Sequence, residues 1–421
     1  MVAPRLFTHD AAVKGDVAPG FEAVRATFEA GFNEGTEWGA ALSVTHQGRN
    51  VVDLWGGVRD RERQIPWQAD TLSTGFSSTK GLVALCFLML CDRGQLDYDT
   101  PVATYWPEFG QRGKSEISVR CLLNHRSGLI GVSTPITLDL IEHEPERVAQ
   151  ILAEQVPTWT PDTNQGYHGV TYGLYAQELF KRIAGETLGA FLRREVGEPL
   201  NADVYLGLPT EFEGRVAKNY PSTLRERVFN VVPQLLLTTN EGRVFRQVVS
   251  GGDTARAFAH PAELGPRGLD NFNSRRVHGL ELPWANALMS ARGLCRVYSA
   301  LALGGQANGV RLVQPETIGP VMERQSWSAQ DRVLRKPLGW SQGFLKEETG
   351  MFSPNQTSFG HPGAGGSMGW CDPENQLAIG YLANKMDYHI RSPRARRLCK
   401  AIYECLAVSD RAWRSASRAP R

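Results

Sequence analysis

A hydroxyl and an amine lie three residues apart at Ser77 and Lys80, just before an apolar run from Leu82 to Leu90. Residues three apart share a face of a helix, so a helix that begins near Ser77 brings the amine close to the hydroxyl proton. Backbone N–H groups at the start of a helix also favour nearby negative charge. The pair is therefore a candidate activated nucleophile.

The Ser77/Lys80 pair has little weight alone, because ordinary serine and lysine usage gives roughly one or two such pairs in a chain of this length. A helix-capping serine and a solvated lysine are the alternative interpretation. The position of Lys80 before an all-apolar helix favours burial. A buried lysine needs a partner or a lowered pKa, and a lowered pKa suits a residue that moves a proton.

A second candidate is Tyr167 in the stretch TNQGYHGVTYGLYAQELF, where it precedes a predicted helix. A phenol whose pKa is lowered by a nearby lysine ammonium could act as general base and later as general acid. A core tyrosine is the alternative, and for Tyr167 in isolation it is favoured. Tyr172 and Tyr175 have helical spacing and are interpreted as packing residues.

The third candidate stretch is the glycine-rich sequence SFGHPGAGGSMG. A strand rich in glycine lets a backbone N–H group approach a substrate closely. Together with the N–H group of Ser77, such a group would form an oxyanion hole, which is often the largest single contribution to catalysis. A flexible glycine loop is the alternative.

In this order and spacing the three stretches resemble the serine β-lactamase and penicillin-binding-protein superfamily. They resemble most closely its class C β-lactamase-like esterases, often called family VIII carboxylesterases. FSSTKG matches the Ser-x-x-Lys motif, which implies that Ser77 is the nucleophile and Lys80 its partner. YHGVTYGL lies where the family has Tyr-x-Asn. The resemblance therefore implies a general-base role for Tyr167 and a substrate-binding role for the adjacent His168.

FGHPGAGGSMGWCDPE takes the place of the family's Lys-Thr-Gly strand. His361 and Gly363 then replace its lysine and glycine as substrate-binding residues, and Ala364 supplies the second oxyanion N–H group beside that of Ser77. The family's lysine helps to bind the carboxylate of β-lactams, whereas His361 is a weaker, pH-dependent cation. Gly169 replaces the asparagine that contacts peptide-like amides. Both changes favour esters over β-lactams and cell-wall peptides.

Taken together, these residues predict a serine esterase that hydrolyses small to medium carboxylic esters through an acyl-enzyme on Ser77. Acyl transfer to an alcohol acceptor and amide hydrolysis of the β-lactamase or D-aminopeptidase type are the open alternatives. A non-catalytic binding scaffold is the least favoured. The expected partner is a small-molecule ester, without a metal, an organic cofactor, nucleic acid or a membrane. The oligomeric state is left open.

The sequence GGSMG at 365–369 matches Gly-x-Ser-x-Gly, the nucleophile elbow of α/β-hydrolases. That elbow needs a strand-to-helix turn, with an acid and a histidine following in order. Only 52 residues follow the motif (421 minus 369), and His389 is the single histidine among them. Ser367 is therefore predicted to be a structural residue of a hairpin. His125 is interpreted as a structural, hydrogen-bonded histidine.

The elements that must position these residues follow from the hydrophobic periodicity. Residues 21–32 predict a helix, and WGAALSVTHQGRNVVDLWGG predicts a β-hairpin with its turn at 46–49. The helix after Ser77 is apolar on every side, so it is expected to be buried and to end at Gly94. After Pro337, three neighbouring strands are expected in LGWSQGFLKEE, SFGHPGAGGSMGWCDP and NQLAIGYLANKM, followed by an amphipathic helix around RARRLCKAIYECLA.

Strands at both ends with helices between them predict an α/β (α+β) fold of the β-lactamase/transpeptidase-like type. Residues 1–96 and 336–421 are expected to form an antiparallel sheet flanked by helices. Residues 97–335 are expected to form a mainly helical inserted subdomain, with the active site between the two parts. The region 223–280 has poor periodicity and is expected to line or cover the acyl pocket.

The composition narrows the class of protein. The 421 residues include 46 basic and 44 acidic ones, and this near-neutral balance gives no electrostatic reason to expect nucleic-acid binding. Seven cysteines, an odd number without a Cys-x-x-Cys motif, indicate a reduced compartment. The sequence shows no apolar run of signal-peptide length at its start and none of 18 residues elsewhere, so the cytoplasm is the expected location.

Overall fold

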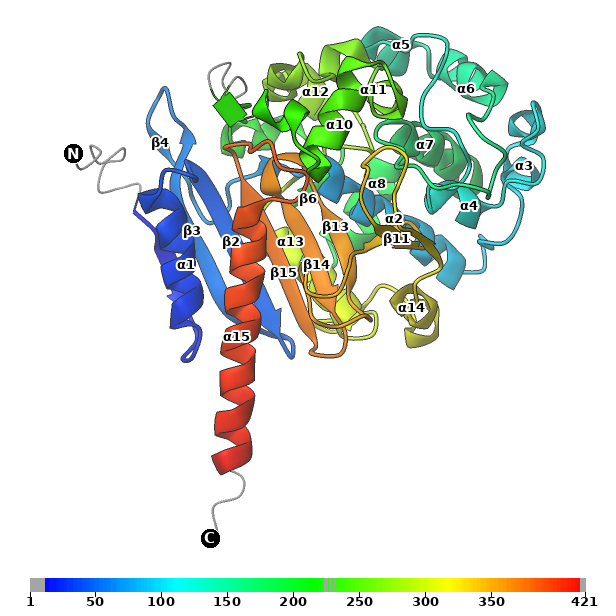
Figure 1. The fold of residues 1–421 in the computed structure, drawn as a ribbon. Helices are drawn as coiled ribbons and strands as arrows, with labels where there is room; N and C mark the ends of the chain where they lie inside the picture. The colour runs from blue at the N-terminus through cyan, green and yellow to red at the C-terminus, as the bar shows by residue number, and fades with distance from the viewer. Residues whose placement is uncertain (1–11, 223–225, 227–228, 231, 417–421) are drawn as a thin grey trace.

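The computed structural model describes residues 12–222, 226, 229–230 and 232–416, with side chains to residue 407. Strands from both ends of the chain form one antiparallel sheet, as expected, and Figure 1 shows helices on both of its faces. In spatial order the strands are β1 (Lys14–Val17), β3 (Arg49–Asp60), β2 (Gly39–His46), β15 (Leu377–Ala383), β14 (Met368–Asp372), β13 (Phe359–Pro362), β12 (Phe344–Lys346), β11 (Leu338–Ser341) and β10 (Ser326–Ser328); β4 (Ile65–Pro66) pairs with β3.

The predicted hairpin forms as β2 and β3, and its turn places Gln47 and Gly48 at positive φ angles of 52° and 73°. Two successive positive φ angles suit the right-handed twist of a hairpin. The ends of the chain meet where β2 pairs with β15, in a register that sets Leu42 opposite Tyr381. The predicted N-terminal helix forms as α1 (Glu22–Asn33), which packs beside the C-terminal helix α15 (Pro393–Ala416).

The prediction of three strands after Pro337 was incomplete, because two of those stretches each fold into a hairpin. LGWSQGFLKEE forms β11 and β12 around Gln342 and Gly343, whose φ angles are 47° and 85°. SFGHPGAGGSMGWCDP forms β13 and β14. The sheet also begins earlier than expected, since β10 precedes residue 336.

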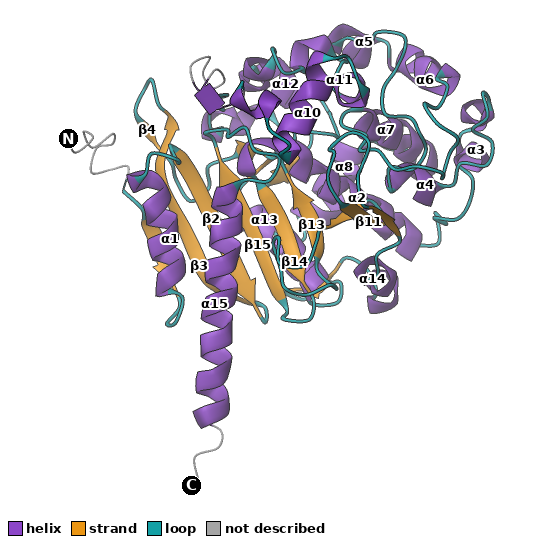
Figure 2. Ribbon diagram, viewed as in Figure 1, coloured by secondary structure: helices purple, strands orange, loops and turns teal. Residues whose placement is uncertain are grey.

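Helices are the main regular structure of the inserted region, and Figure 2 shows most of them grouped beyond one edge of the sheet. Its α-helices are α3 (Val102–Tyr105), α4 (Val119–Leu123), α5 (Leu138–His143), α6 (Pro145–Glu154), α7 (Thr171–Ala184), α8 (Leu188–Leu192), α10 (Asn240–Val249), α11 (Asp253–Ala257), α12 (Arg275–Gly279), α13 (Ala291–Ala302) and α14 (Pro315–Met322). Small strands also occur: β5 (Ser73–Thr74), β6 (Val204–Tyr205) and β7 (Leu288–Met289) pair together, as do β8 (Gln306–Ala307) and β9 (Val310–Arg311).

Helix α13 is an exception within the inserted region, because it packs against the sheet over β2, β14 and β15. Gly380 permits this contact: a Cβ atom there would lie 2.3 Å from the Ala291 carbonyl oxygen. The sheet is therefore covered by α1 and α15 on one face and by α13 on the other. Among the described residues, no helix combines the length and the apolar character needed to cross a membrane.

Candidate active site

The candidate nucleophile lies in a short 3₁₀ turn, η2 (Phe76–Ser78), which leads into α2 (Thr79–Asp92). Helix α2 is buried from Thr79 to Leu90, and Gly94 follows it with a φ of 69°, as predicted. Phe76 has a φ of 45°, a costly conformation for a bulky residue that is found mainly where the surrounding structure enforces it. This turn places Ser77 at the open end of a rigid, buried helix.

Lys80 is fully buried and lies close to the nucleophile, with its Nζ atom 3.3 Å from Ser77 Oγ. The amine donates to the backbone oxygens of Gly169 at 2.9 Å and of Trp284 at 2.8 Å. Within the described part of the chain no carboxylate forms an ion pair with it, and burial lowers the pKa of Lys80 well below its ordinary value. A neutral amine has two N–H groups for these two carbonyls, which leaves its lone pair for the proton of Ser77.

Tyr167 completes the contacts of the nucleophile, since its hydroxyl donates to Ser77 Oγ at 2.8 Å. Its backbone N–H group donates to Asp331 at 3.1 Å, and its ring stacks on Trp340 with 5.8 Å between centroids. Burial raises the pKa of Tyr167 above its ordinary value of 10. This direction is opposite to the sequence expectation, because Lys80 is buried without a counter-charge and favours its neutral form. Tyr167 is therefore a phenol that donates a hydrogen bond.

The glycine-rich stretch approaches the nucleophile from the sheet, at the end of β13. A Cβ atom on Gly363 would lie 2.2 Å from the Gly75 carbonyl oxygen and 3.2 Å from the Ser77 backbone nitrogen, so glycine is required here. Ala364 begins the short turn η10 (Ala364–Gly366) and lines the same cavity as Ser77. The pairing of the Ser77 and Ala364 N–H groups as an oxyanion hole stays a prediction.

Ser367 is a structural residue, as predicted. It lies in the connection between the antiparallel strands β13 and β14, not in a strand-to-helix turn. Its hydroxyl donates to the Gly75 carbonyl oxygen at 2.6 Å, and its oxygen lies 3.3 Å from that of Ser78. Ser367 thus fastens the glycine-rich stretch to the turn that carries the nucleophile, and the nucleophile-elbow interpretation is excluded.

His361 does not provide the cationic character that the sequence suggested. It is buried, and its Nδ1–H group donates to the Pro362 carbonyl oxygen at 2.7 Å. Burial lowers its pKa well below the ordinary value, so the ring is neutral. Its centroid lies 6.2 Å from that of Tyr167, and no hydrogen bond joins the two side chains in the part of the chain that the structure describes.

The side chain of His168 points away from the cavity, although the sequence suggested a contact with substrate. Its ring nitrogens lie 2.8 Å from His125 Nδ1 and 3.1 Å from Ser127 Oγ. Burial lowers the pKa of His168 to about 3, so its ring is neutral. His125 is buried and hydrogen-bonded, as predicted. The two histidines support the backbone that leads into α7 and carries the Gly169 carbonyl.

A cavity of about 440 Å³ opens beside the nucleophile. The region 223–280, which was expected to line or cover the acyl pocket, supplies 11 of the 22 lining residues, from α10, α11, the turns η8 (Ala262–Leu264) and η9 (Leu269–Asn273), and the loops between them. The lining side chains are mainly apolar and include Val244, Phe245, Val248, Phe258, Leu264, Leu269, Phe272 and Trp284. Such a surface suits the hydrocarbon part of a substrate.

Gly169 shows why the family's asparagine is absent from this site. A Cβ atom on Gly169 would lie 2.5 Å from the ring of Phe258 and 2.8 Å from the Ala257 carbonyl oxygen. The space that an asparagine side chain would need is therefore filled by an aromatic ring of the cavity wall.

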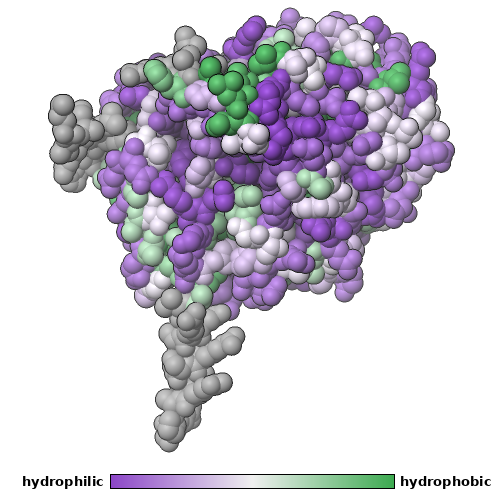
Figure 3. All heavy atoms as spheres, viewed as in Figure 1, coloured by the Kyte–Doolittle hydropathy of each residue, from purple (hydrophilic) through white to green (hydrophobic). Residues whose placement is uncertain are grey.

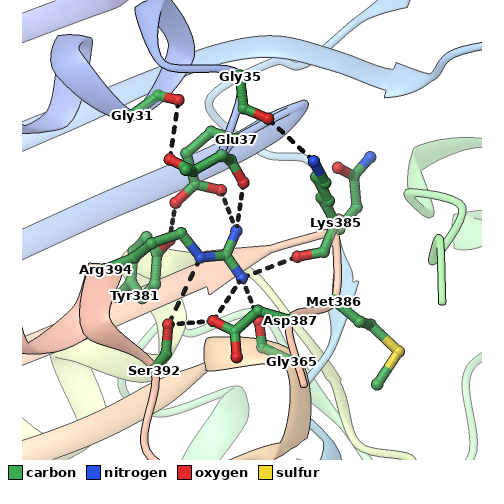
Figure 4. A network of polar contacts seen from close by, with 12 residues as sticks. Gly31, Gly35, Glu37, Gly365, Tyr381, Lys385, Met386, Asp387, Ser392 and Arg394 are labelled. Carbon is green, nitrogen blue, oxygen red and sulfur yellow. Dashed lines mark hydrogen bonds and ion pairs between the residues drawn. The ribbon is translucent and has the colours of Figure 1, made fainter. Parts of the chain in front are cut away.

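A buried ionic network holds η10 in place from the far side (Figure 4). The Arg394 guanidinium, on α15, donates to the carbonyl oxygens of Gly365 at 2.5 Å and Lys385 at 2.8 Å, and to Glu37 Oε2 at 2.7 Å. Asp387 Oδ2 lies 3.4 Å from it. Burial would raise the pKa of Asp387, but hydrogen bonds from His389 and the nearby Arg394 charge lower it below its ordinary value. Asp387, which also lines the cavity, is thus ionised.

The beta-lactamase family profile matches residues 24–400. This chain belongs to the beta-lactamase family. Among curated relatives of this family member, the esterase/beta-lactamase LipL of Mycobacterium tuberculosis is 32% identical over 382 residues, covering 89% of this chain and 83% of that protein. By family and fold the protein is an esterase/beta-lactamase-like hydrolase.

Two solved structures of the family extend the similarity to the fold. A family VIII carboxylesterase superposes with a TM-score of 0.81 and 34% identity, covering 94% of this chain and all (100%) of that one. EstA of Arthrobacter nitroguajacolicus gives a TM-score of 0.79 and 32% identity, with coverages of 93% and 98%. The predicted fold class and the resemblance to this superfamily are confirmed.

Four supporting groups in this family member were missed by the sequence interpretation. Trp340 stacks on Tyr167, Asp331 accepts its backbone N–H group, Trp284 binds Lys80 through a carbonyl, and Arg394 holds η10. Each acts across a large sequence separation.

Proposed function

We propose that this protein is a serine esterase that hydrolyses small to medium carboxylic esters through an acyl-enzyme on Ser77. One observation carries the proposal: the Ser77 hydroxyl contacts both the Tyr167 phenol and the buried Lys80 amine at the edge of an apolar cavity. A nucleophile, a proton acceptor and a donor within hydrogen-bond reach are the parts that acyl transfer requires.

In the first half of the proposed reaction, Ser77 Oγ attacks the ester carbonyl carbon and its proton passes to the neutral Lys80 amine. The carbonyl π electrons move to oxygen, and the N–H groups of Ser77 and Ala364 stabilise the resulting charge. The intermediate then re-forms the carbonyl and expels the alcohol. The alcohol takes a proton from Lys80, relayed by the Tyr167 hydroxyl, and the acyl group stays on Ser77.

In the second half, a water molecule attacks the acyl-enzyme. Tyr167 passes the proton of this water to Lys80 and receives another from it when Ser77 leaves as the restored hydroxyl. The carboxylic acid product then departs. The raised pKa of Tyr167 suits this role, because the phenol gives up one proton only as it gains another.

The charges around the cavity support neutral esters as the substrate class. Asp387 is an ionised carboxylate in the lining, and His361 is neutral. The described residues that line the cavity include no arginine, lysine or histidine. A carboxylate-bearing β-lactam would meet repulsion from Asp387 without a compensating cation, so β-lactam hydrolysis is expected to be the weaker activity.

The direct test is hydrolysis of short p-nitrophenyl esters by the wild type, Ser77→Ala and Ser367→Ala, with mass spectrometry after a serine-reactive phosphonate. We expect Ser77→Ala to lose turnover and labelling while Ser367→Ala keeps its label on Ser77. Full activity in Ser77→Ala would contradict the proposal. Added alcohols in the same assay measure acyl transfer against hydrolysis through the ratio of new ester to acid.

We also propose the cytoplasm as the working location. Five buried cysteines are free thiols: Cys86, Cys121, Cys295, Cys371 and Cys399. Free thiols are typical of proteins from reducing compartments. Fractionation of the native host with an antibody against the protein would test the location.

A further inference from the structure

Large apolar side chains are strongly exposed at eight described positions, and six of these positions fall between residues 229 and 249. Five of them surround the turn η7 (Pro233–Leu236) and the end of α10, and we call these five the η7–α10 patch: Val232, Leu236, Leu237, Val248 and Val249. Figure 3 shows hydrophobic side chains gathered in green at the upper edge of the molecule, where η7 and α10 lie. Single exposed apolar residues are ordinary, but a cluster of this kind marks a binding surface.

The patch is one structural unit, although its residues come from two elements. Turn η7 packs against α10. Arg246, on α10, donates to the carbonyl oxygens of Leu235 at 2.8 Å and Leu237 at 2.7 Å. A Cβ atom on Gly242 would lie 2.2 Å from the Gln234 carbonyl oxygen, so the close approach of the two elements requires glycine there. The apolar side chains are thus presented to solvent by a bonded scaffold.

The patch is continuous with the acyl cavity through one helix. Val244 and Phe245 of α10 line the cavity, and Val248, one turn further on, both lines it and is 40% exposed. An apolar surface therefore runs from the solvent along α10 to the chamber beside Ser77. This continuity indicates that the patch contacts the same kind of group that suits the cavity, which is the hydrocarbon part of a substrate.

Resting on the proposed esterase function, we propose that the η7–α10 patch adsorbs the protein to droplets of aggregated ester, so that long acyl chains pass from droplet to cavity. Esters with long acyl chains separate from water as droplets, and their surface is apolar. Burying a large apolar side chain is favourable in rough proportion to its area. The exposed residues gain that burial only when substrate is aggregated, so soluble short esters do not need the patch.

The experiment compares a soluble ester, p-nitrophenyl acetate, with p-nitrophenyl laurate on both sides of its solubility limit. The wild type is expected to gain rate steeply once laurate droplets form. The variant Leu236→Ser/Val249→Ser changes side chains that are 89% and 76% exposed, so its fold is expected to be kept. We expect its rate on laurate droplets to fall roughly tenfold, because two apolar side chains no longer gain burial at the droplet surface. Its rate on the soluble acetate should not change. The matched control is Val156→Ser, an equivalent change at a valine outside the patch that is 56% exposed, which should behave as wild type.

A second readout needs no catalysis: adsorption of the protein to hexadecane droplets, measured by flotation. We expect the wild type and Val156→Ser to float and the double variant to stay in solution. Equal flotation of all three proteins, or a smooth wild-type rate across the laurate limit, would overturn the proposal. A change of oligomeric state in the double variant, without loss of flotation, would assign the patch to self-association instead. If the protein floats but hydrolyses neither ester, the esterase function fails while the adsorbing surface stands.

Discussion

The two sides of the Ser77 hydroxyl are built on opposite principles. On one side, Lys80 and Tyr167 are buried, and their polar atoms reach fixed partners. On the other side, the cavity wall formed by α10 and its neighbours is apolar, and α10 continues into an exposed surface. A buried polar group needs its hydrogen bonds, so its geometry is narrowly defined, whereas apolar contact is non-directional. In the proposed enzyme, the groups for the chemistry and the groups for substrate choice therefore belong to separable parts of the molecule.

The largest expected effect comes from the catalytic side, in Lys80→Arg. Arginine stays protonated and cannot accept the Ser77 proton, so we expect kcat to fall by about a thousandfold or more with little change in KM. The measurement is steady-state kinetics on p-nitrophenyl butyrate. Lys114→Arg is a matched control, because Lys114 is also buried and also donates to two carbonyls, of Ala153 and Gln155, away from the site. An equal loss of kcat in both variants would indicate a structural effect and not a catalytic one.

Arg394→Lys tests how far the buried network supports the catalytic side. Lysine cannot reproduce the several hydrogen bonds of the guanidinium to Glu37, Gly365 and Lys385, so η10 should lose its fixed position. We expect kcat to fall by roughly ten- to a hundredfold, in the range of a damaged oxyanion hole, while KM changes less. Arg397→Lys, on the same helix but half-exposed, should leave both constants unchanged. A rise in KM alone would mean that the network supports substrate binding instead.

The pH profile sharpens the assignment of the proton acceptor. In the proposed mechanism Lys80 must be neutral, and protonation below its pKa removes the acceptor, so kcat/KM should rise with pH through that pKa and then level off. Below the pKa the expected slope is about tenfold per pH unit. Because burial lowers the Lys80 pKa well below its ordinary value, the plateau should begin well below pH 10.5. A rise centred at the ordinary lysine pKa would exclude Lys80 as a buried neutral base.

The smallest expected effect tests the substrate side, in Gly169→Asn. The asparagine would collide with Phe258, so we expect a loss of about tenfold on aliphatic esters. Adding Phe258→Ala should create the missing space and recover part of that activity, while Phe258→Ala alone should only change acyl-chain preference by a few fold. The measurement is steady-state kinetics of all three variants on esters whose acyl chains have four to twelve carbons. If the double variant is as impaired as Gly169→Asn, the Phe258 ring does not limit this position.

Local features of the sequence were sufficient to predict most of the helices and strands near the site. The apolar run after Ser77 predicted a buried helix, and Gly94 predicted its end. These features depend on periodicity and on single residues with restricted backbone conformations, which act over a few positions. The two extra hairpins after Pro337 were not visible, because a turn such as Gln342-Gly343 interrupts an apolar stretch only briefly.

The sequence by itself determined which groups are present. They are a serine and a lysine at helical spacing, a tyrosine before a helix, and a glycine-rich strand that includes Gly363. Tertiary structure alone decided their state. Burial lowered the pKa values of Lys80 and His361 and raised the pKa of Tyr167, because desolvation depends on every element packed around a group. The same distant packing turned His168 away from the cavity. Spacing along a chain fixes which side chains are neighbours on one helix, but it carries no information on how much water remains around them.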